Sequence, residues 1–186
     1  DIRNRTSSTS GNPAAIQNDD TILENTAFKF NWQIMSANSF VGSWNNGDKK
    51  KFGRNAGATR PQETTWDQRG PTAIYKFEDT HVFSSSFFLG GTYGKVDGGF
   101  SLVSKACIAN NGCENAPETL WDNNGVWRRS YWGGPSSRPS DEFKLDGSYF
   151  FNAGNSSHEL KFGGRMRTFE QLSTFSWPGR NLFTID

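Results

Sequence analysis

Long apolar runs are absent from this sequence, and aliphatic residues are scarce. Only 33% of the 186 residues are hydrophobic, and 16 Phe and 7 Trp supply much of that share. A core of Leu, Ile and Val, as in an ordinary soluble domain, is therefore not expected. No stretch approaches the ~18 consecutive apolar residues of a transmembrane helix, but this does not exclude membrane strands, which need only ~9–11 residues and are half apolar.

A strong excess of charge is also absent, because 20 basic and 19 acidic residues give a net charge of +1. No field of one sign would attract nucleic acid. The two histidines, His81 and His158, have no nearby nucleophile and no HExxH spacing, and Ser84–Ser86 lacks a G-x-S-x-G frame. We therefore expect neither an enzyme nor a cofactor or metal site.

The only cysteines, Cys107 and Cys113, are six residues apart in a polar, turn-rich segment. This spacing suits a small disulfide that closes a loop outside the cytosol, with two free thiols as the alternative. Asp122–Gly125 has oxygen ligands close together but lacks the full calcium-loop pattern, so we interpret it as a turn.

What the sequence does contain is alternation with a period of two, which places successive side chains on opposite faces of a strand. It occupies residues 21–45, 73–104 and 141–175. A change of parity in the second segment predicts a β-bulge between Gly94 and Gly99. Each segment is predicted to be a hairpin, and the short turns are Ser36–Asn38, Ser84–Ser86 and Asn152–Ser157.

Unpatterned segments flank and separate these hairpins. Residues 46–72 and 105–140 are predicted to be long loops, and residues 1–20 a loop or tail. Because turns and loops alternate, up-and-down topology places all short turns at one end and both long loops at the other. Outer-membrane barrels have this asymmetry, with short periplasmic turns and long extracellular loops.

The predicted fold class is all-β, with about six antiparallel, up-and-down strands from a transmembrane β-barrel. A soluble β-sandwich also has alternating strands, but its inner face would favour Val, Ile and Leu over aromatic residues near the turns. The residues predicted to face lipid are Phe28, Phe30, Trp32, Tyr75, Phe77, Phe87, Leu89, Phe143, Tyr149, Phe162 and Met166. The residues predicted to face the lumen are Lys29, Lys76, Glu78, Lys144, Glu159, Lys161, Arg165 and Arg167.

Two segments carry a family resemblance. ETTWDQRGPTAIYKFEDTHVFSSSFFLGGTYGKVDGGFSL (Glu63–Leu102) and SSRPSDEFKLDGSYFFNAGNSSHELKFGGRMRTF (Ser136–Phe169) resemble the barrel of TonB-dependent receptors of the Oar-like kind, typical of Acidobacteria. The resemblance implies a barrel of about twenty-two strands in the outer membrane of a Gram-negative bacterium. It also implies an N-terminal plug domain and energy from the TonB complex of the inner membrane. Because neither a plug nor a coupling box is visible, we expect a partial sequence.

The partners implied are outer-membrane lipid and lipopolysaccharide, the plug domain, the remaining barrel strands and the TonB complex. Lys49–Lys51 is either a contact for lipopolysaccharide phosphates or a solvated run. The loop residues Trp121, Trp127, Arg128, Arg129 and Trp132 either form a substrate-catching surface or pack the loops on one another. The predicted function is nutrient uptake with an unknown substrate. The alternative is a secreted or surface carbohydrate-binding β-sandwich.

Overall fold

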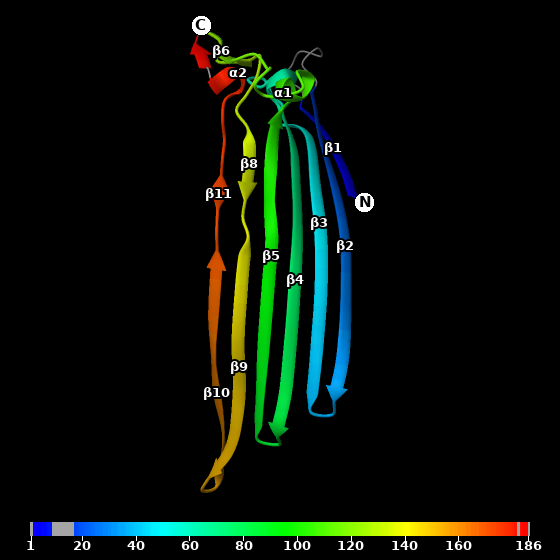
Figure 1. Ribbon diagram of the computed structural model, residues 1–186, viewed down its shortest axis with the longest axis vertical. Coiled ribbons are helices and arrows are strands. Elements are labelled where there is room, and N and C mark those ends of the chain that lie inside the picture. Colours follow the sequence, from blue (N-terminus) through cyan, green and yellow to red (C-terminus); the bar gives the residue numbers. More distant parts are fainter. Residues whose placement is uncertain (1, 9–16, 182, 186) are drawn as a thin grey trace.

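The fold is given by a computed structural model that describes residues 2–8, 17–181 and 183–185 (Figure 1). It is all-β, and nine antiparallel strands form one sheet, called the main sheet. Its strand order is β1-β2-β3-β4-β5, after which β5 pairs with both β8 and β9; β8 continues to β11 and β9 to β10. The strands are β1 (Ile2–Ser8), β2 (Gln17–Met35), β3 (Asn38–Arg54), β4 (Trp66–Ser84), β5 (Phe87–Ser104), β8 (Gly134–Ser137), β9 (Ser140–Ala153), β10 (Ser156–Phe169) and β11 (Leu172–Ser173).

The predicted strands correspond to β2, β3, β4, β5, β9 and β10, but six is too low a number, because β1, β8 and β11 also belong to the main sheet. β8 and β9 keep one register against β5, with Gly99 opposite Ser137 and Val96 opposite Ser140. They form a single path that is interrupted at Pro139, which has no N–H to donate to the ladder. Among the described residues, the outer strands of the main sheet do not pair with each other.

The three predicted short turns are confirmed, and all lie at one end of the main sheet, opposite the longer connections (Figure 1). The turns are not level with one another. β4 continues past the Asn38–His81 pair to Ser84, and β9 continues past the Phe87–Tyr149 pair to Ala153. Such a stagger accompanies the strand tilt of closed barrels.

The long strands extend beyond their predicted ends. β2 and β4 have 19 residues each, about 60 Å at ~3.3 Å per residue. Residues 17–20, 46–54 and 66–72 are therefore strand rather than loop or tail. Lys50–Glu24 and Lys51–Asp19 ion pairs join these extensions. Because both of their faces are polar, hydrophobic alternation cannot reveal them.

The predicted tail, residues 1–20, also contains β1, which pairs with β2 from Ile2 to Ser8. Residue 1 and residues 9–16 of that predicted tail lie outside the described residues.

The predicted β-bulge between Gly94 and Gly99 is wrong. Ile74 pairs with Val96 and Thr72 with Gly98, in one unbroken register with the pairs on either side. Phe100 and Leu102 are apolar on the otherwise polar side of the sheet because other segments cover them there. Leu102 is only 5% exposed, and the Arg138 guanidinium lies 4.9 Å from the Phe100 ring centroid.

The connections opposite the turns fold into a compact region, called the loop cap, which covers residues 55–65, 105–133 and 174–185 as described. It holds a three-stranded sheet in the order β12-β6-β7, in which β12 and β6 are parallel. No helix in the described residues is long and apolar enough to cross a membrane. The elements of the loop cap are η2 (Gln62–Thr64), α1 (Lys105–Ala109), β6 (Thr119–Trp121), β7 (Trp127–Arg128), α2 (Pro178–Asn181) and β12 (Phe183–Ile185).

Candidate functional site: a two-faced sheet and its loop cap

One face of the main sheet is aromatic across six strands. In antiparallel pairing, residues directly opposite each other share a face. Phe28 pairs with Trp44 and Trp44 with Tyr75; Tyr93 links Phe77 to Phe143. This register places every residue predicted to face lipid on a single face, called the aromatic face, and every residue predicted to face the lumen on the other, called the polar face. What covers each face remains a prediction.

Rings on the aromatic face contact one another between strands. The ring centroids of Phe30 and Phe40 are 5.8 Å apart, and those of Phe40 and Phe77 are 6.2 Å apart. These side chains nevertheless remain open to the surroundings, as Phe28 is 61% exposed and Met166 67%. Among the described residues, no second sheet packs over this face, since the three-stranded sheet lies at the loop end (Figure 1).

The aromatic face ends part of the way along the strands. Towards the turns, β2 carries Phe28 to Ile34 on this face, about 20 Å of strand at ~3.3 Å per residue. Towards the loop cap the same face becomes polar at Glu24, Asp48 and Lys50. Lys50 lies 2.6 Å from Glu24, and this hydrogen bond raises the pKa of Lys50. This length along one strand is of the same order as the ~25 Å apolar band of outer-membrane barrels, although the tilt of barrel strands makes its height across a membrane smaller.

The polar face is rich in ion pairs. Lys76 pairs with Glu78 at 2.6 Å and Lys144 with Asp146 at 2.7 Å, each within one strand. Lys161 pairs with Glu159 at 3.4 Å. Arg165 pairs across strands with Glu142. Because these pairs are partly exposed, each contributes little to stability. Together they make this face polar and suited to contact with water.

The predicted lysine run lies within β3 rather than in a loop. Lys49 and Lys51 are on the polar face, whereas Lys50 is on the aromatic side, next to Glu24 and Asp48. Lys51 pairs with Asp19. The run therefore does not form one patch of unpaired cations for phosphate groups.

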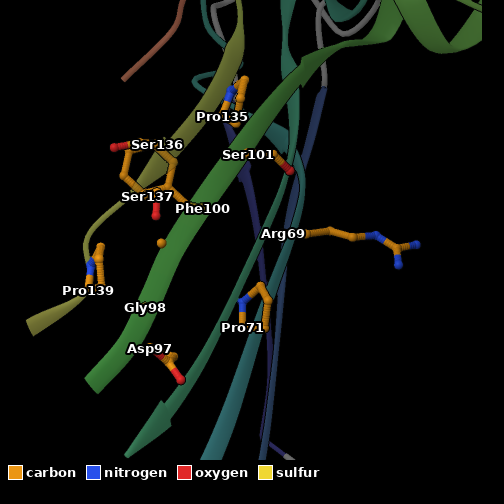
Figure 2. Close-up of a pocket in the computed structure, with 11 residues that line it drawn as sticks. Arg69, Pro71, Asp97, Gly98, Phe100, Ser101, Pro135, Ser136, Ser137 and Pro139 are labelled. Carbon is orange, nitrogen blue, oxygen red and sulfur yellow. The ribbon is translucent and has the colours of Figure 1, made fainter. Parts of the chain in front are cut away.

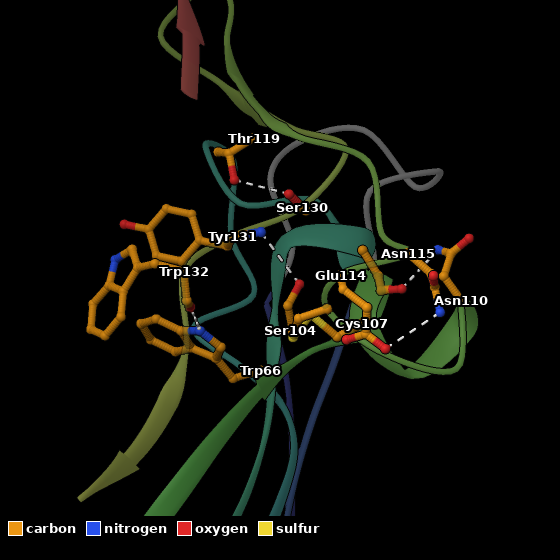
Figure 3. The surroundings of a disulfide bond; sticks show 12 residues. Trp66, Ser104, Cys107, Asn110, Glu114, Asn115, Thr119, Ser130, Tyr131 and Trp132 are labelled. Atoms are coloured by element: carbon orange, nitrogen blue, oxygen red, sulfur yellow. Dashed lines mark hydrogen bonds between the residues drawn. A yellow bond between two sulfur atoms is a disulfide. The ribbon is translucent and has the colours of Figure 1, made fainter. Parts of the chain in front are cut away.

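The predicted disulfide between Cys107 and Cys113 is confirmed (Figure 3). Their Cα atoms are 4.3 Å apart, and the bridge ties the middle of α1 to the segment that follows the helix. Together with Ala106 and Ala116 it forms a small buried apolar cluster. This cluster anchors the loop cap on the side away from Trp66 and Trp132 (Figure 3).

Hydroxyl groups occupy much of the remaining interior of the loop cap. Thr64, Thr119 and Ser130 have no exposed surface. The Thr119 and Ser130 hydroxyls are 2.9 Å apart, and the Tyr131 backbone N–H donates to Ser104 Oγ at 3.3 Å (Figure 3). Because these hydroxyl groups are paired, they avoid the cost of unsatisfied polar atoms, whereas Arg60 Nε is buried without a hydrogen-bond partner among the described residues.

A cluster of aromatic rings forms the other half of the loop cap. The Trp66 ring contacts Tyr131 and Trp132 at centroid distances of 5.2 and 4.9 Å. Trp66 Nε1 also donates to the Trp132 carbonyl at 2.5 Å. Arg60 lies over Tyr131 at 3.5 Å and over Trp66 at 4.6 Å. Burial of this guanidinium lowers the pKa of Arg60 to about 10.

The predicted loop-contact residues are brought together, but mainly to pack the loops on one another. Trp121 and Trp127 have ring centroids 4.3 Å apart. Arg128 pairs with Asp122 at 2.8 Å, and Arg129 with Glu118 at 3.3 Å. Of the predicted set, Trp132 lines an open pocket, together with Phe175, Ser176 and Trp177.

The predicted turn at Asp122–Gly125 is confirmed between β6 and β7. Asp122 Oδ1 accepts hydrogen bonds from the backbone N–H groups of Asn124 and Val126, both at 2.9 Å. Its other oxygen is engaged by Arg128, and this hydrogen bond lowers the pKa of Asp122. Both oxygens of this carboxylate therefore accept hydrogen bonds that stabilise the turn.

A groove of about 420 Å³ lies where β4, β5 and β8 meet (Figure 2). Its walls include Pro71, Asp97 and Gly99, and Arg69 extends away from Ser136 and Ser137 (Figure 2). A Cβ at Gly99 would come within 2.4 Å of the Ser136 carbonyl oxygen. Glycine is required here for the close approach of β8, and the lining groups include no pair suited to acid-base chemistry.

The histidines lie against aromatic rings near the turns. His81 is 4.3 Å from Phe83 and His158 is 5.3 Å from Phe151, measured between ring centroids. Within the part of the chain that the structure describes, no three His, Cys, Asp or Glu side chains are grouped as metal ligands would be.

No sequence pattern indicates that five residues from distant segments belong to one cluster: Arg60, Trp66, Tyr131, Phe175 and Trp177. The high density of tryptophan in residues 121–132 is the one sequence signal for this cluster. It points to the rings of that segment but not to the residues from other segments that they contact. Comparison with protein-family models, with curated proteins and with solved structures found no match.

Proposed function

We propose that this chain forms part of the wall of an outer-membrane β-barrel that takes up a nutrient, in a TonB-dependent receptor of the Oar-like kind. The observation that carries the proposal is the aromatic face, which is continuous in register across six strands and is covered by no second layer among the described residues. Transfer of one such side chain out of water is worth about 1.5–3 kcal/mol. Lipid would supply that gain along the whole face.

The polar face supports the lumenal side of the same assignment. A surface rich in Lys, Glu and Arg suits a water-filled or plugged interior, in which strands alternate between lipid and lumen. The turns would then face the periplasm and the loop cap the exterior. A disulfide between Cys107 and Cys113 fits that location, because disulfides persist in oxidising compartments.

The outer edge of β10 argues for further strands. Every residue from Ser156 to Phe169 is exposed, including the apolar Leu160 and Phe162. An unpaired edge of this length would be costly in lipid, because its N–H and C=O groups would lack partners. The remaining strands of the parent barrel would satisfy them.

The rival assignment, a carbohydrate-binding sandwich, is less well supported. A sandwich buries one face of each sheet against another sheet. Here the aromatic face is exposed, and no buried layer of aliphatic side chains covers it among the described residues. The buried hydrophobic residues of the main sheet, Trp66 and Leu102, lie at the loop end.

A thiol scan tests the membrane assignment in the protein that carries this chain, assembled in the outer membrane. The two cysteines of this chain are bonded to each other, so an introduced cysteine is the free thiol that this chain contributes, and any free cysteine elsewhere in the protein is first replaced by Ser. A fluorophore at Phe28→Cys or Phe30→Cys should be quenched by a nitroxide on the lipid chains. The matched Lys29→Cys and Asn31→Cys variants should instead be quenched by a water-soluble agent. Equal water exposure at all four positions would overturn the barrel assignment.

The receptor assignment has a separate test in the gene that encodes this chain. We expect a plug domain and an energy-coupling box upstream, and further alternating strands. A gene that encodes a closed small barrel without a plug would overturn it while leaving the wall assignment intact.

A further inference from the structure

We propose that Trp132, Phe175, Ser176 and Trp177 form a binding site for one unit of a neutral saccharide. The inference deepens the proposed function and rests on it for the view that the loop cap faces the exterior and meets the nutrient first. These four residues line a pocket of about 300 Å³, the lower end of the range for small-molecule sites, roughly 300–1,000 Å³.

The lining determines the charge of the ligand. Three of the four side chains are aromatic and the fourth is a hydroxyl, so no charged group among the described residues faces the pocket. Of the arginines in this region, Arg128 is engaged by Asp122 and Arg129 by Glu118. Arg60 is buried against the Tyr131 and Trp66 rings and does not line the pocket. A charged ligand would lose its hydration without gaining a partner. A neutral ligand is therefore favoured.

The arrangement of rings favours a sugar over a flat aromatic ligand. Trp132 and Phe175 meet at 70°, with centroids 4.9 Å apart, so they form a corner rather than a parallel slot. A corner suits a puckered ring that presents C–H groups to one aromatic face and to the edge of another. Ser176 is exposed and supplies a hydroxyl that can donate to or accept from a sugar hydroxyl.

The rings are held in place before any ligand arrives. Trp132 is supported by its contact with Trp66 and by the hydrogen bond from Trp66 Nε1 to its carbonyl. Trp177 stacks on Trp127 at 5.8 Å and contacts Tyr131 at 5.7 Å. Backbone hydrogen bonds in both directions join Gly133 to Ser176, at 3.0 and 2.9 Å. Such preorganisation reduces the entropy lost on binding.

The loop cap also places this pocket on the polar side of the main sheet. Trp66 lies opposite Arg54 and shares the parity of Lys76 and Glu78 along β4. The aromatic cluster that begins at Trp66 therefore builds up from the polar face, over the end of the predicted lumen. A ligand in the pocket would lie at the entrance to the barrel.

The test is a titration of the detergent-purified protein that carries this chain with maltotetraose, cellotetraose and xylotetraose, followed by tryptophan fluorescence and calorimetry. At least one tetrasaccharide should bind at concentrations up to about 10 mM, the range of a weak single-unit site. Caffeine, a neutral flat aromatic compound, should not compete. Absence of binding by all three saccharides, or displacement by caffeine, would overturn the inference.

Variants assign the binding to this pocket. Trp177→Ala should weaken saccharide binding roughly two- to tenfold, the loss expected for one aromatic contact, and Trp177→Phe should restore part of it. Ile108→Ala is the control, because Ile108 belongs to the loop cap, is 48% exposed and does not line the pocket. Equal losses in Trp177→Ala and Ile108→Ala would refute the assignment. If a saccharide binds but the thiol scan fails, the barrel assignment is wrong and the binding site stands. If the thiol scan succeeds but no saccharide binds, only the binding site is wrong.

Discussion

On the aromatic face, Phe28 and Met166 leave 61% and 67% of their surface exposed, whereas Trp66, at the start of β4 and packed against the loop cap, leaves 5%. The two regions use aromatic residues for different surroundings. Loop-cap rings contact each other and a buried arginine, and the neighbouring hydroxyl groups are paired. Rings on the aromatic face form one layer that no second layer covers among the described residues. The loop cap thus packs on its own rings, whereas the main sheet leaves its rings open, as the proposed barrel wall requires.

The side on which the loop cap packs strengthens this contrast. It buries Leu102 and Trp66 at the loop end of the polar face and leaves the apolar band of the aromatic face open. On that side Lys105 of the loop cap pairs with Asp67, beyond the apolar band. In a soluble protein, other segments would be expected to pack against the apolar face first, because the hydrophobic effect is the dominant favourable contribution to folding. Packing of the loop cap on the polar face is consistent with the proposal that lipid covers the aromatic face.

The largest expected effect comes from a charge on the aromatic face. Phe77→Arg should destabilise the folded protein in bilayers by about 2–4 kcal/mol, the cost of arginine near the midplane of a barrel wall. Urea unfolding in phospholipid vesicles measures it. Thr92→Arg is the control, because Thr92 lies opposite Glu78 on the polar face. If both variants lost the same stability, the two faces would not differ in their surroundings.

Loss of the disulfide should affect only the loop cap. Replacing both Cys107 and Cys113 by Ser should destabilise it by about 2 kcal/mol, as expected for a short closed loop. Hydrogen exchange should become faster in α1 and its surroundings, while the central pairs of β3 and β4 keep their protection. Equally faster exchange in β3 and β4 would show that the two regions fold as one unit.

Sequence periodicity predicted the sheet well where one face is apolar. The assignment of Phe28 and Lys29 to opposite faces needs only local alternation, and the register confirms it. Alternation failed where both faces are polar, as in the extension of β3 through Lys50, since ion pairs leave no hydrophobic signal.

The loop cap was beyond prediction for a different reason. Trp66 contacts Trp132, which is 66 residues away, and Arg60 reaches the same rings from a third segment. No period or local spacing connects these positions, because each contact depends on how the long connections fold back over the polar face. The disulfide was predictable because its two cysteines are close in sequence and have no competing partners.

An effect of similar size to the loss of the disulfide concerns one cross-strand pair on the aromatic face. Gly42 lies opposite Phe30, and a Cβ at Gly42 would come within 2.2 Å of the Phe30 ring. Gly42→Ala should therefore force the ring to move and cost about 1–3 kcal/mol, as overpacking does. Unfolding in vesicles measures the loss. Gly91→Ala is the matched control, since its Cβ would meet no atom within 4 Å.

The comparison of these two glycines separates a packed ring from a merely exposed one. If the Phe30 ring only provides an apolar surface for lipid, it can turn away from an alanine at position 42 without a loss of stability. Both variants should then be equally stable. If the ring must also cover the strand beside it, only Gly42→Ala is destabilised, and Phe30→Leu in the same background should recover part of the loss. The second outcome would mean that the aromatic face is held by packing between its own strands as well as by lipid.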